Sequence, residues 1–289
     1  MKTKKLLLGI AFIILTVTSC TNESEEVMTS SDTVATQKID DAVDDIVLIA
    51  DDQFEVTEGL SVSKTATGGY HSILPECAHV SDLGSTETLR HLTITFGTDN
   101  TTCTFRGRVL KGQIIIDRTK GNTFPKTLTV TFNNFYSNDK KIEGTISWSR
   151  EMVGEGVDIH PKTTVTTTNL KYITSEGTYT RNGVKTREMT AGFSTLSSPT
   201  DDVYATYGTF TTTLPNGDVY TSLIEPETPL IRKTACSLMT PSIHCPVSGI
   251  LKVSKNSHYI TLDFGNGDCD NLAMKSIDGG TAVQIVLED

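Results

Sequence analysis

Apolar and polar residues alternate in a series of short segments, and this period of two limits the possible folds more than any other feature of the chain. In residues 128–132, for example, Leu, Val and Phe alternate with Thr. Such alternation is typical of antiparallel strands with one buried face. The pattern occurs in residues 91–96, 114–116, 128–132 and 142–148. We therefore expect an all-β chain, an antiparallel meander or sandwich in one large or two related β units.

Turn motifs fall between several of these segments. Asn-Gly pairs favour the tight turn of a β-hairpin because both central residues adopt positive φ there. Asn-Asp marks a similar reversal. These pairs lie at residues 138–139, 182–183 and 216–217. Each position is predicted to be a turn between neighbouring strands.

Residues 36–50 depart from this period. Ile39, Val43, Ile46 and Ile49 are spaced by four, three and three positions, which places them on one helical face with aspartates opposite. The spacing predicts a short helix on or just before the β body. We interpret it as a packing helix at the end of a tether, with a partner-binding helix as the alternative.

The N-terminus has the features of an export signal. Three lysines precede an apolar run, Leu6 to Val17. As a helix this run would be about 18 Å long, shorter than the roughly 30 Å hydrocarbon core of a membrane. Val17-Thr18-Ser19-Cys20 resembles the lipobox of bacterial lipoproteins. The resemblance implies that residues 1–19 are removed and that Cys20 carries the lipid; an ordinary secretory signal is the alternative.

Acidic residues are concentrated directly after this signal. Residues 21–60 carry 12 acidic and 1 basic side chains, whereas the whole chain has a formal net charge of −10. We therefore expect residues 20–60 to form a solvated tether around the helix, attached to a nearly neutral body. An acidic mature chain also argues against nucleic acid as a partner. Glu23–Glu26 resembles the surface-export signal of Bacteroidetes lipoproteins, and Asp32-Thr33-Val34 resembles the O-glycosylation motif of that phylum, with Thr33 as acceptor.

The cysteines suggest an internal repeat. Cys77 and Cys103 are 26 residues apart, Cys245 and Cys269 are 24 apart, and each pair brackets a similar strand. We therefore divide the β body into residues 61–235 and a C-terminal unit, residues 236–289, which repeats the pattern of residues 77–116. An exported protein can form disulfides, and the repeat predicts the disulfides Cys77–Cys103 and Cys245–Cys269. Cys236 is then left over, or it pairs with Cys269 in place of Cys245.

No catalytic motif is found in the sequence, which lacks His-Glu-x-x-His, Gly-x-Ser-x-Gly and phosphate-binding glycine loops. Asn266, Asp268 and Asp270 alternate as oxygen ligands do in calcium loops, but the rest of such a loop is missing. A tight Gly/Asn turn explains this cluster better. We therefore expect no cofactor and favour a non-enzymatic role.

Two segments, residues 133–145 and 262–273, resemble Bacteroidetes lipoproteins of uncharacterised function. The resemblance implies a protein anchored in the outer membrane by the lipid on Cys20, at the cell surface or else on the periplasmic face. Its expected role is binding, adhesion or structure, with an extracellular protein or glycan as partner. The alternative is a surface glycan-binding protein or hydrolase with a site on the sheet loops.

Overall fold

A single antiparallel sheet of 15 strands accounts for most of the described chain, so the all-β prediction is confirmed. The computed structural model describes residues 30–58, 72–97, 102–121, 123–195, 199–237, 239, 243 and 245–287. Cys20, the predicted lipidation site, lies outside these residues. Thr33 lies within a helix, at a position whose side chain is not described.

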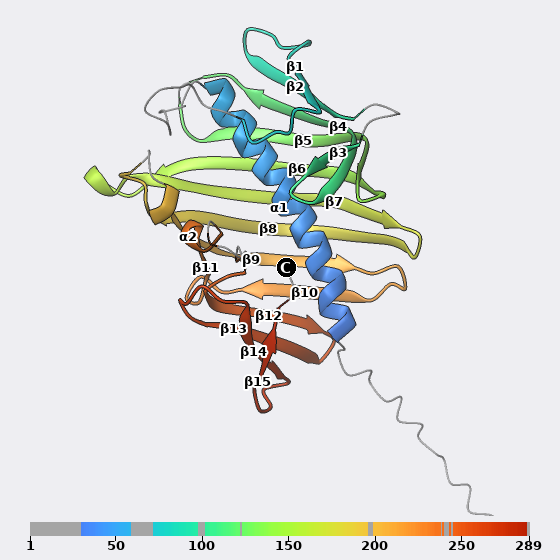
Figure 1. Cartoon of the computed structure of the whole chain (residues 1–289), viewed down its shortest axis with the longest axis vertical. Helices are drawn as coiled ribbons and strands as arrows, with labels where there is room; N and C mark the ends of the chain where they lie inside the picture. Colours follow the sequence, from blue (N-terminus) through green and yellow to red (C-terminus); the bar gives the residue numbers. More distant parts are fainter. Residues whose placement is uncertain are drawn as a thin grey trace, which may run out of the picture.

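The strands follow one another along the sheet with few exceptions (Figure 1). Their bounds in the first half are β1 Ala78–Ser81, β2 Leu89–Phe96, β3 Cys103–Phe105, β4 Arg108–Thr119, β5 Lys126–Ser137, β6 Lys140–Val153 and β7 His160–Thr174. In the second half they are β8 Gly177–Ala191, β9 Val203–Thr213, β10 Val219–Ile224, β11 Leu230–Lys233, β12 Ser248–Lys255, β13 His258–Asn266, β14 Leu272–Ile277 and β15 Val283–Val286. The remaining elements are α1 Ser30–Glu58, α2 Thr234–Ser237 and the one-turn helices η1 Gly156–Asp158 and η2 Pro199–Asp201.

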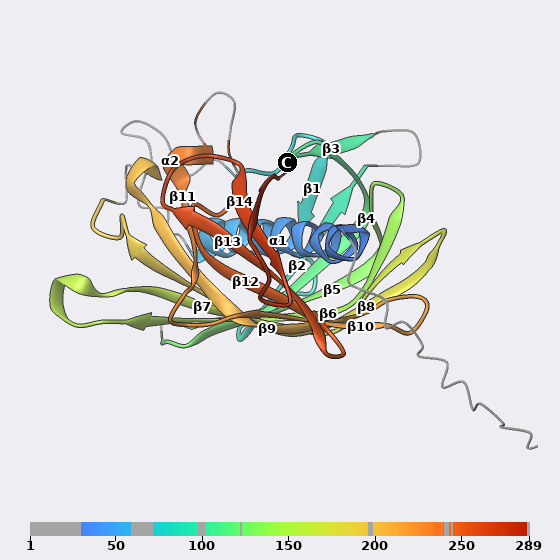
Figure 2. The ribbon, with the colours of Figure 1, turned by 90° about the horizontal axis from the view of Figure 1, so that it is seen from below.

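Hydrogen bonds join the two units that the sequence suggested. β12, which follows residue 236, pairs with β10, for example through Thr221 and Ser254. β1 to β4 and β12 to β15 therefore lie at opposite ends of one sheet. Figure 2 shows both ends curving up on either side of α1.

Two of the three predicted turns lie where strands reverse. Asn138 and Asp139 have φ values of 48° and 62° and connect β5 to β6 as a two-residue hairpin turn. Gly217 lies in the loop between β9 and β10, and its N–H donates to the carbonyl of Leu214 at 2.9 Å. Positive φ at these positions explains why Asn, Asp and Gly occur there.

The third predicted turn, Asn182-Gly183, is wrong. Both residues lie inside β8, paired with Thr211 and Phe210 of β9. Gly183 is required by close packing, since a Cβ atom there would lie 2.4 Å from Cβ of Phe210. Asn182 accepts a hydrogen bond from the backbone N–H of Asn169 at 2.8 Å, where the register of β7 shifts. The actual reversal is at residues 175–176.

The predicted helix exists, but it is longer and more deeply placed than expected. α1 has 29 residues and crosses the concave face of the sheet diagonally (Figures 1 and 2). Its apolar face, which includes Ile39, Ile46 and Ile49, is buried in the same core as Ile114 and Ile146 of the sheet. α1 is therefore a packing helix, as the sequence predicted, and it forms part of the hydrophobic core.

Aspartates of α1 form ion pairs with basic side chains of the sheet, which corrects the expectation of a solvated acidic segment. Asp45 pairs with Arg106 and Arg108, each at 3.1 Å, and Asp51 pairs with Arg150 at 3.1 Å. These contacts place part of the chain's acidity inside the fold. Each aspartate thus helps to fix the position of α1 on the sheet.

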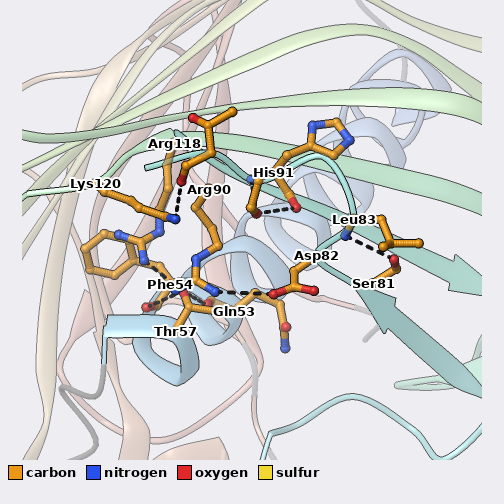
Figure 3. A network of polar contacts seen from close by, with 12 residues as sticks. Gln53, Phe54, Thr57, Ser81, Asp82, Leu83, Arg90, His91, Arg118 and Lys120 are labelled. Carbon is orange, nitrogen blue, oxygen red and sulfur yellow. Dashed lines mark hydrogen bonds and ion pairs between the residues drawn. The ribbon is translucent and has the colours of Figure 1, made fainter. Parts of the chain in front are cut away.

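Aromatic and basic side chains hold the C-terminal part of α1. Phe54 lies 4.9 Å from Trp148, measured between ring centroids, and the guanidinium groups of Arg118 and Arg150 each lie 5.2 Å from the centre of the Phe54 ring. Arg118 also donates to Oγ1 of Thr57 at 3.1 Å (Figure 3). The contacts of Arg118 connect α1 to β4, and those of Trp148 and Arg150 connect it to β6.

The structure contains two disulfides, and one of them corrects a prediction. Cys77–Cys103 is present, with a Cα–Cα distance of 5.4 Å. The second bond joins Cys236 to Cys269, so Cys245–Cys269 is wrong and the alternative pairing is correct. The prediction from the repeat failed because it used only the spacings of the cysteines, whereas α2 brings Cys236 next to the β13–β14 connection.

In the described part of the chain, no helix has the length and apolar character needed to cross a membrane.

Candidate ligand-binding site

A cavity of about 390 Å³ lies between α1 and the strands β7, β8, β9 and β11. We refer to it as the basic cavity. Its lining is Val43, Asp44, Val47, Leu48, Arg106, Val165, Thr167, Arg181, Gly183, Val184, Lys185, Arg187, Tyr204, Thr206, Phe210, Leu230, Arg232, Lys233, Thr234, Ile243 and Cys245. Its volume lies within the range of small-molecule sites, about 300–1,000 Å³.

Cross-strand pairing brings the lining side chains together. Lys185 of β8 lies opposite Val165 of β7, and Arg187 lies opposite Thr206 of β9. Thr206 in turn pairs with Leu230 of β11. Because alternate residues of a strand point to the same face, these side chains all face the inner side of the sheet, under α1.

Basic side chains dominate the charge of the cavity. Arg106, Arg181, Lys185, Arg187, Arg232 and Lys233 line it, against one acidic lining residue, Asp44. Oδ1 of Asp44 lies 2.8 Å from Nζ of Lys185, and its Oδ2 lies 3.5 Å from the guanidinium of Arg232. Arg106 is paired with Asp45, but the single carboxylate of Asp44 cannot neutralise the other five cations, so the cavity has a positive potential that favours anions.

The environment of Asp44 shows how strongly this field acts. Burial by itself would raise the pKa of Asp44, but the positive charges of Lys185, Arg232 and Arg187 outweigh it and lower the pKa to about 2. Asp44 is therefore ionised at neutral pH. Its carboxylate marks the position at which the cavity stabilises a negative charge.

Aromatic rings hold two of the arginines in place. The guanidinium of Arg181 lies 3.8 Å from the centre of the Phe210 ring, and that of Arg187 lies 3.7 Å from the centre of the Tyr204 ring. Stacking of this kind orients the guanidinium plane and leaves its edge able to donate hydrogen bonds. The side chains are thus positioned before any ligand arrives.

A second hollow lies at the C-terminal end of α1 and is lined in part by Gln53, Leu74, Asp82 and Arg90. Figure 3 shows polar contacts between side chains of the protein in this region. Arg90 pairs with Asp82 at 3.8 Å. Nearby, Asp52 accepts hydrogen bonds from the hydroxyl of Ser72 and the N–H of Ile73 at 2.6 and 3.0 Å. These contacts attach residues 72–73 to α1, and we assign this hollow a structural role.

The three calcium candidates lie at the end of β13 and in the connection to β14, where Asp270 makes a turn contact. Asn266 is the last residue of β13, and Oδ1 of Asp270 accepts the N–H of Leu272 at 3.1 Å. Asp268 precedes the disulfide-bonded Cys269. Among the described residues, no group of three or more His, Cys, Asp or Glu side chains is arranged to hold a metal ion.

Sequence reasoning missed the basic cavity, although one signal was available. Arg181, Lys185 and Arg187 occupy odd-numbered positions, which places them on one face of a strand. The prediction of a turn at Asn182-Gly183 divided this row between two strands. Of the residues singled out from the sequence, Val43, Gly183 and Cys245 line the cavity, and none of them was predicted to bind a ligand. Trp148, the only tryptophan of the chain, is 2 % exposed and belongs to the core.

Comparison with known proteins adds no assignment, because no protein family, no curated protein and no solved structure matches this chain.

Proposed function

We propose that the chain is a lipid-anchored binding protein of the cell envelope, without enzymatic activity, whose basic cavity holds a small organic ligand. The observation that carries the proposal is the cavity itself, about 390 Å³ in volume and lined by six basic residues and many apolar ones. Convergent polar groups in a mostly apolar hollow are the usual features of a small-molecule site. The glycan-binding alternative gains no support from Trp148, the only tryptophan of the chain, because this side chain is buried.

The binding function is tested by filling the cavity. Thr206 lines it and is 7 % exposed, so Thr206→Trp places an indole ring in the ligand space. We expect the full chain carrying Cys20→Ser, which cannot be lipidated, to bind 1-anilinonaphthalene-8-sulfonate at one saturable site, with an increase in probe fluorescence. Thr206→Trp should abolish this increase.

Thr209→Trp is the matched control, since Thr209 lies on the exposed face of the same strand. It should retain the fluorescence increase of the parent. Circular dichroism and thermal unfolding establish that both variants fold. A folded Thr206→Trp variant that binds the probe as well as the parent does would refute the cavity as the binding site.

The anchoring part of the proposal is tested in cells that express the whole chain. An alkyne analogue of palmitate should label the wild-type protein, because the thiol of Cys20 is the attachment point in the proposed lipobox. Cys20→Ser should remove the label, whereas Cys245→Ser should retain it. Equal labelling of wild type and Cys20→Ser would show that Cys20 is not the lipid attachment point.

A further inference from the structure

We propose that the ligand of the basic cavity is a single acyl chain with an anionic headgroup, a carboxylate or a phosphate, and that the headgroup competes with Asp44 for Lys185 and Arg232. This inference rests on the proposed function and names the chemical class of the ligand. It follows from three features of the cavity: its cations, its internal carboxylate and its apolar walls.

The headgroup position is defined by contacts already present. Lys185 and Arg232 approach the same carboxylate, that of Asp44, from β8 and β11. Arg187 lies close enough to contribute to the same field. Three cations around one carboxylate leave the group positively charged, so a second anion gains more from them than it loses by repulsion from Asp44. A guanidinium and an ammonium also suit carboxylate and phosphate oxygens as hydrogen-bond acceptors.

The chain position follows from the apolar part of the lining. Val165, Phe210 and Leu230 come from three different strands, and Val43 and Val47 contribute from α1. These side chains offer no hydrogen bonds to a polar ligand, whereas they favour the transfer of CH₂ groups from water. A purely inorganic anion would have no apolar group to contact this half of the cavity.

Asp44 has a specific role in this arrangement. It occupies the anion position when no ligand is bound, and it keeps Lys185 and Arg232 paired. An incoming headgroup has to share or replace these contacts. The ligand therefore acts directly on an ion pair that connects α1 to the sheet.

The experiment is isothermal titration calorimetry on the full chain carrying Cys20→Ser. Decanoate and decyl phosphate are the probes, and decanol and decyltrimethylammonium are their neutral and cationic counterparts. We expect decanoate to bind roughly tenfold or more tightly than decanol, because only the anion forms charged hydrogen bonds. Shortening decanoate to octanoate should weaken binding by up to about fourfold for each CH₂ removed.

Three variants test the residues. Lys185→Gln combined with Arg232→Gln should weaken decanoate binding by roughly tenfold or more and leave decanol unchanged. Asp44→Asn should strengthen decanoate binding by about three- to fivefold, because it removes the competing charge while it retains the shape of the side chain. Lys171→Gln, which removes an exposed cation from β7, is the control and should have no effect.

The outcomes separate this inference from the proposed function. If decanoate and decanol bind equally, and Thr206→Trp blocks both, the cavity is the site but the anionic class is wrong. If 1-anilinonaphthalene-8-sulfonate binds in the cavity and none of the decyl compounds does, the acyl-chain class is wrong. If neither the fluorescent probe nor a decyl compound binds, the proposed function fails as well. A loss of decanoate affinity in Asp44→Asn would overturn the competition that we assign to Asp44.

Discussion

Phe54→Ala is expected to lower the free energy of unfolding by about 3–5 kcal/mol, the usual range when a fully buried aromatic side chain is truncated. Phe54 is 2 % exposed and packs against Trp148 at 4.9 Å. Arg118 and Arg150 lie over its ring, each at 5.2 Å. Removal of the ring therefore leaves a void beside Trp148 and removes the contact of both guanidinium groups with Phe54, although Arg150 keeps its contact with the Trp148 ring at 4.6 Å. Urea unfolding followed by circular dichroism at neutral pH measures the effect.

Val56→Ala on the same helix is the matched control. Val56 is 39 % exposed, so we expect its truncation to change stability by no more than about 0.5 kcal/mol. Trp148 is the only tryptophan of the chain, and its fluorescence reports directly on the site of the Phe54 substitution. A loss below about 1 kcal/mol for Phe54→Ala would place α1 outside the cooperative core, as a peripheral packing helix would be.

The placement of α1 shows where sequence reasoning reached its limit. The period of Ile39, Ile46 and Ile49 predicts an apolar helical face, and this face is indeed buried. The aspartates on the rest of the helix indicate a solvent-exposed face only if no basic side chain is available to pair with them. Arg106, Arg150 and Lys185, the partners of Asp45, Asp51 and Asp44, are more than 60 positions away in the chain. Local patterns do not reveal pairs at such separations.

The strands were easier to predict than their connections. Alternation identified segments such as 128–132, which lie within β5, because half-burial leaves a period of two in any antiparallel strand. The turn predicted at Asn182-Gly183 was wrong because glycine occurs in sheets for two different reasons. It permits positive φ in a turn, and it also permits close contact with a neighbouring strand, as with Phe210.

The site itself could be predicted only in part. Once β8 is known to be continuous, Arg181, Lys185 and Arg187 fall on one face, and a basic surface follows from the sequence. The cavity itself does not follow from the sequence, because it forms only when α1, β9 and β11 enclose those side chains. Its volume depends on how α1, at the start of the fold, lies against strands more than 100 residues later in the chain.

Replacement of both Cys236 and Cys269 by alanine is expected to lower the free energy of unfolding by about 3–4 kcal/mol, the loop-entropy value for a crosslink of this span. The bond closes a loop of 33 residues and connects α2 to the β13–β14 connection. The double substitution is needed because Cys236→Ala alone would leave Cys269 able to pair with Cys245. Urea unfolding without reductant, compared with the wild-type protein, measures the effect.

Cys245→Ala provides the control that separates the two connectivities. Neither of the two disulfides, Cys77–Cys103 and Cys236–Cys269, includes Cys245, so its replacement should cost less than about 1 kcal/mol. If Cys245–Cys269 were the native bond, as the spacing of the cysteines suggested, Cys245→Ala would cost as much as the double substitution. A peptide map of the unreduced protein should contain Cys236 linked to Cys269 and Cys77 linked to Cys103. Recovery of a Cys245–Cys269 peptide instead would reverse the assignment, and with it the placement of Cys245 beside the basic cavity.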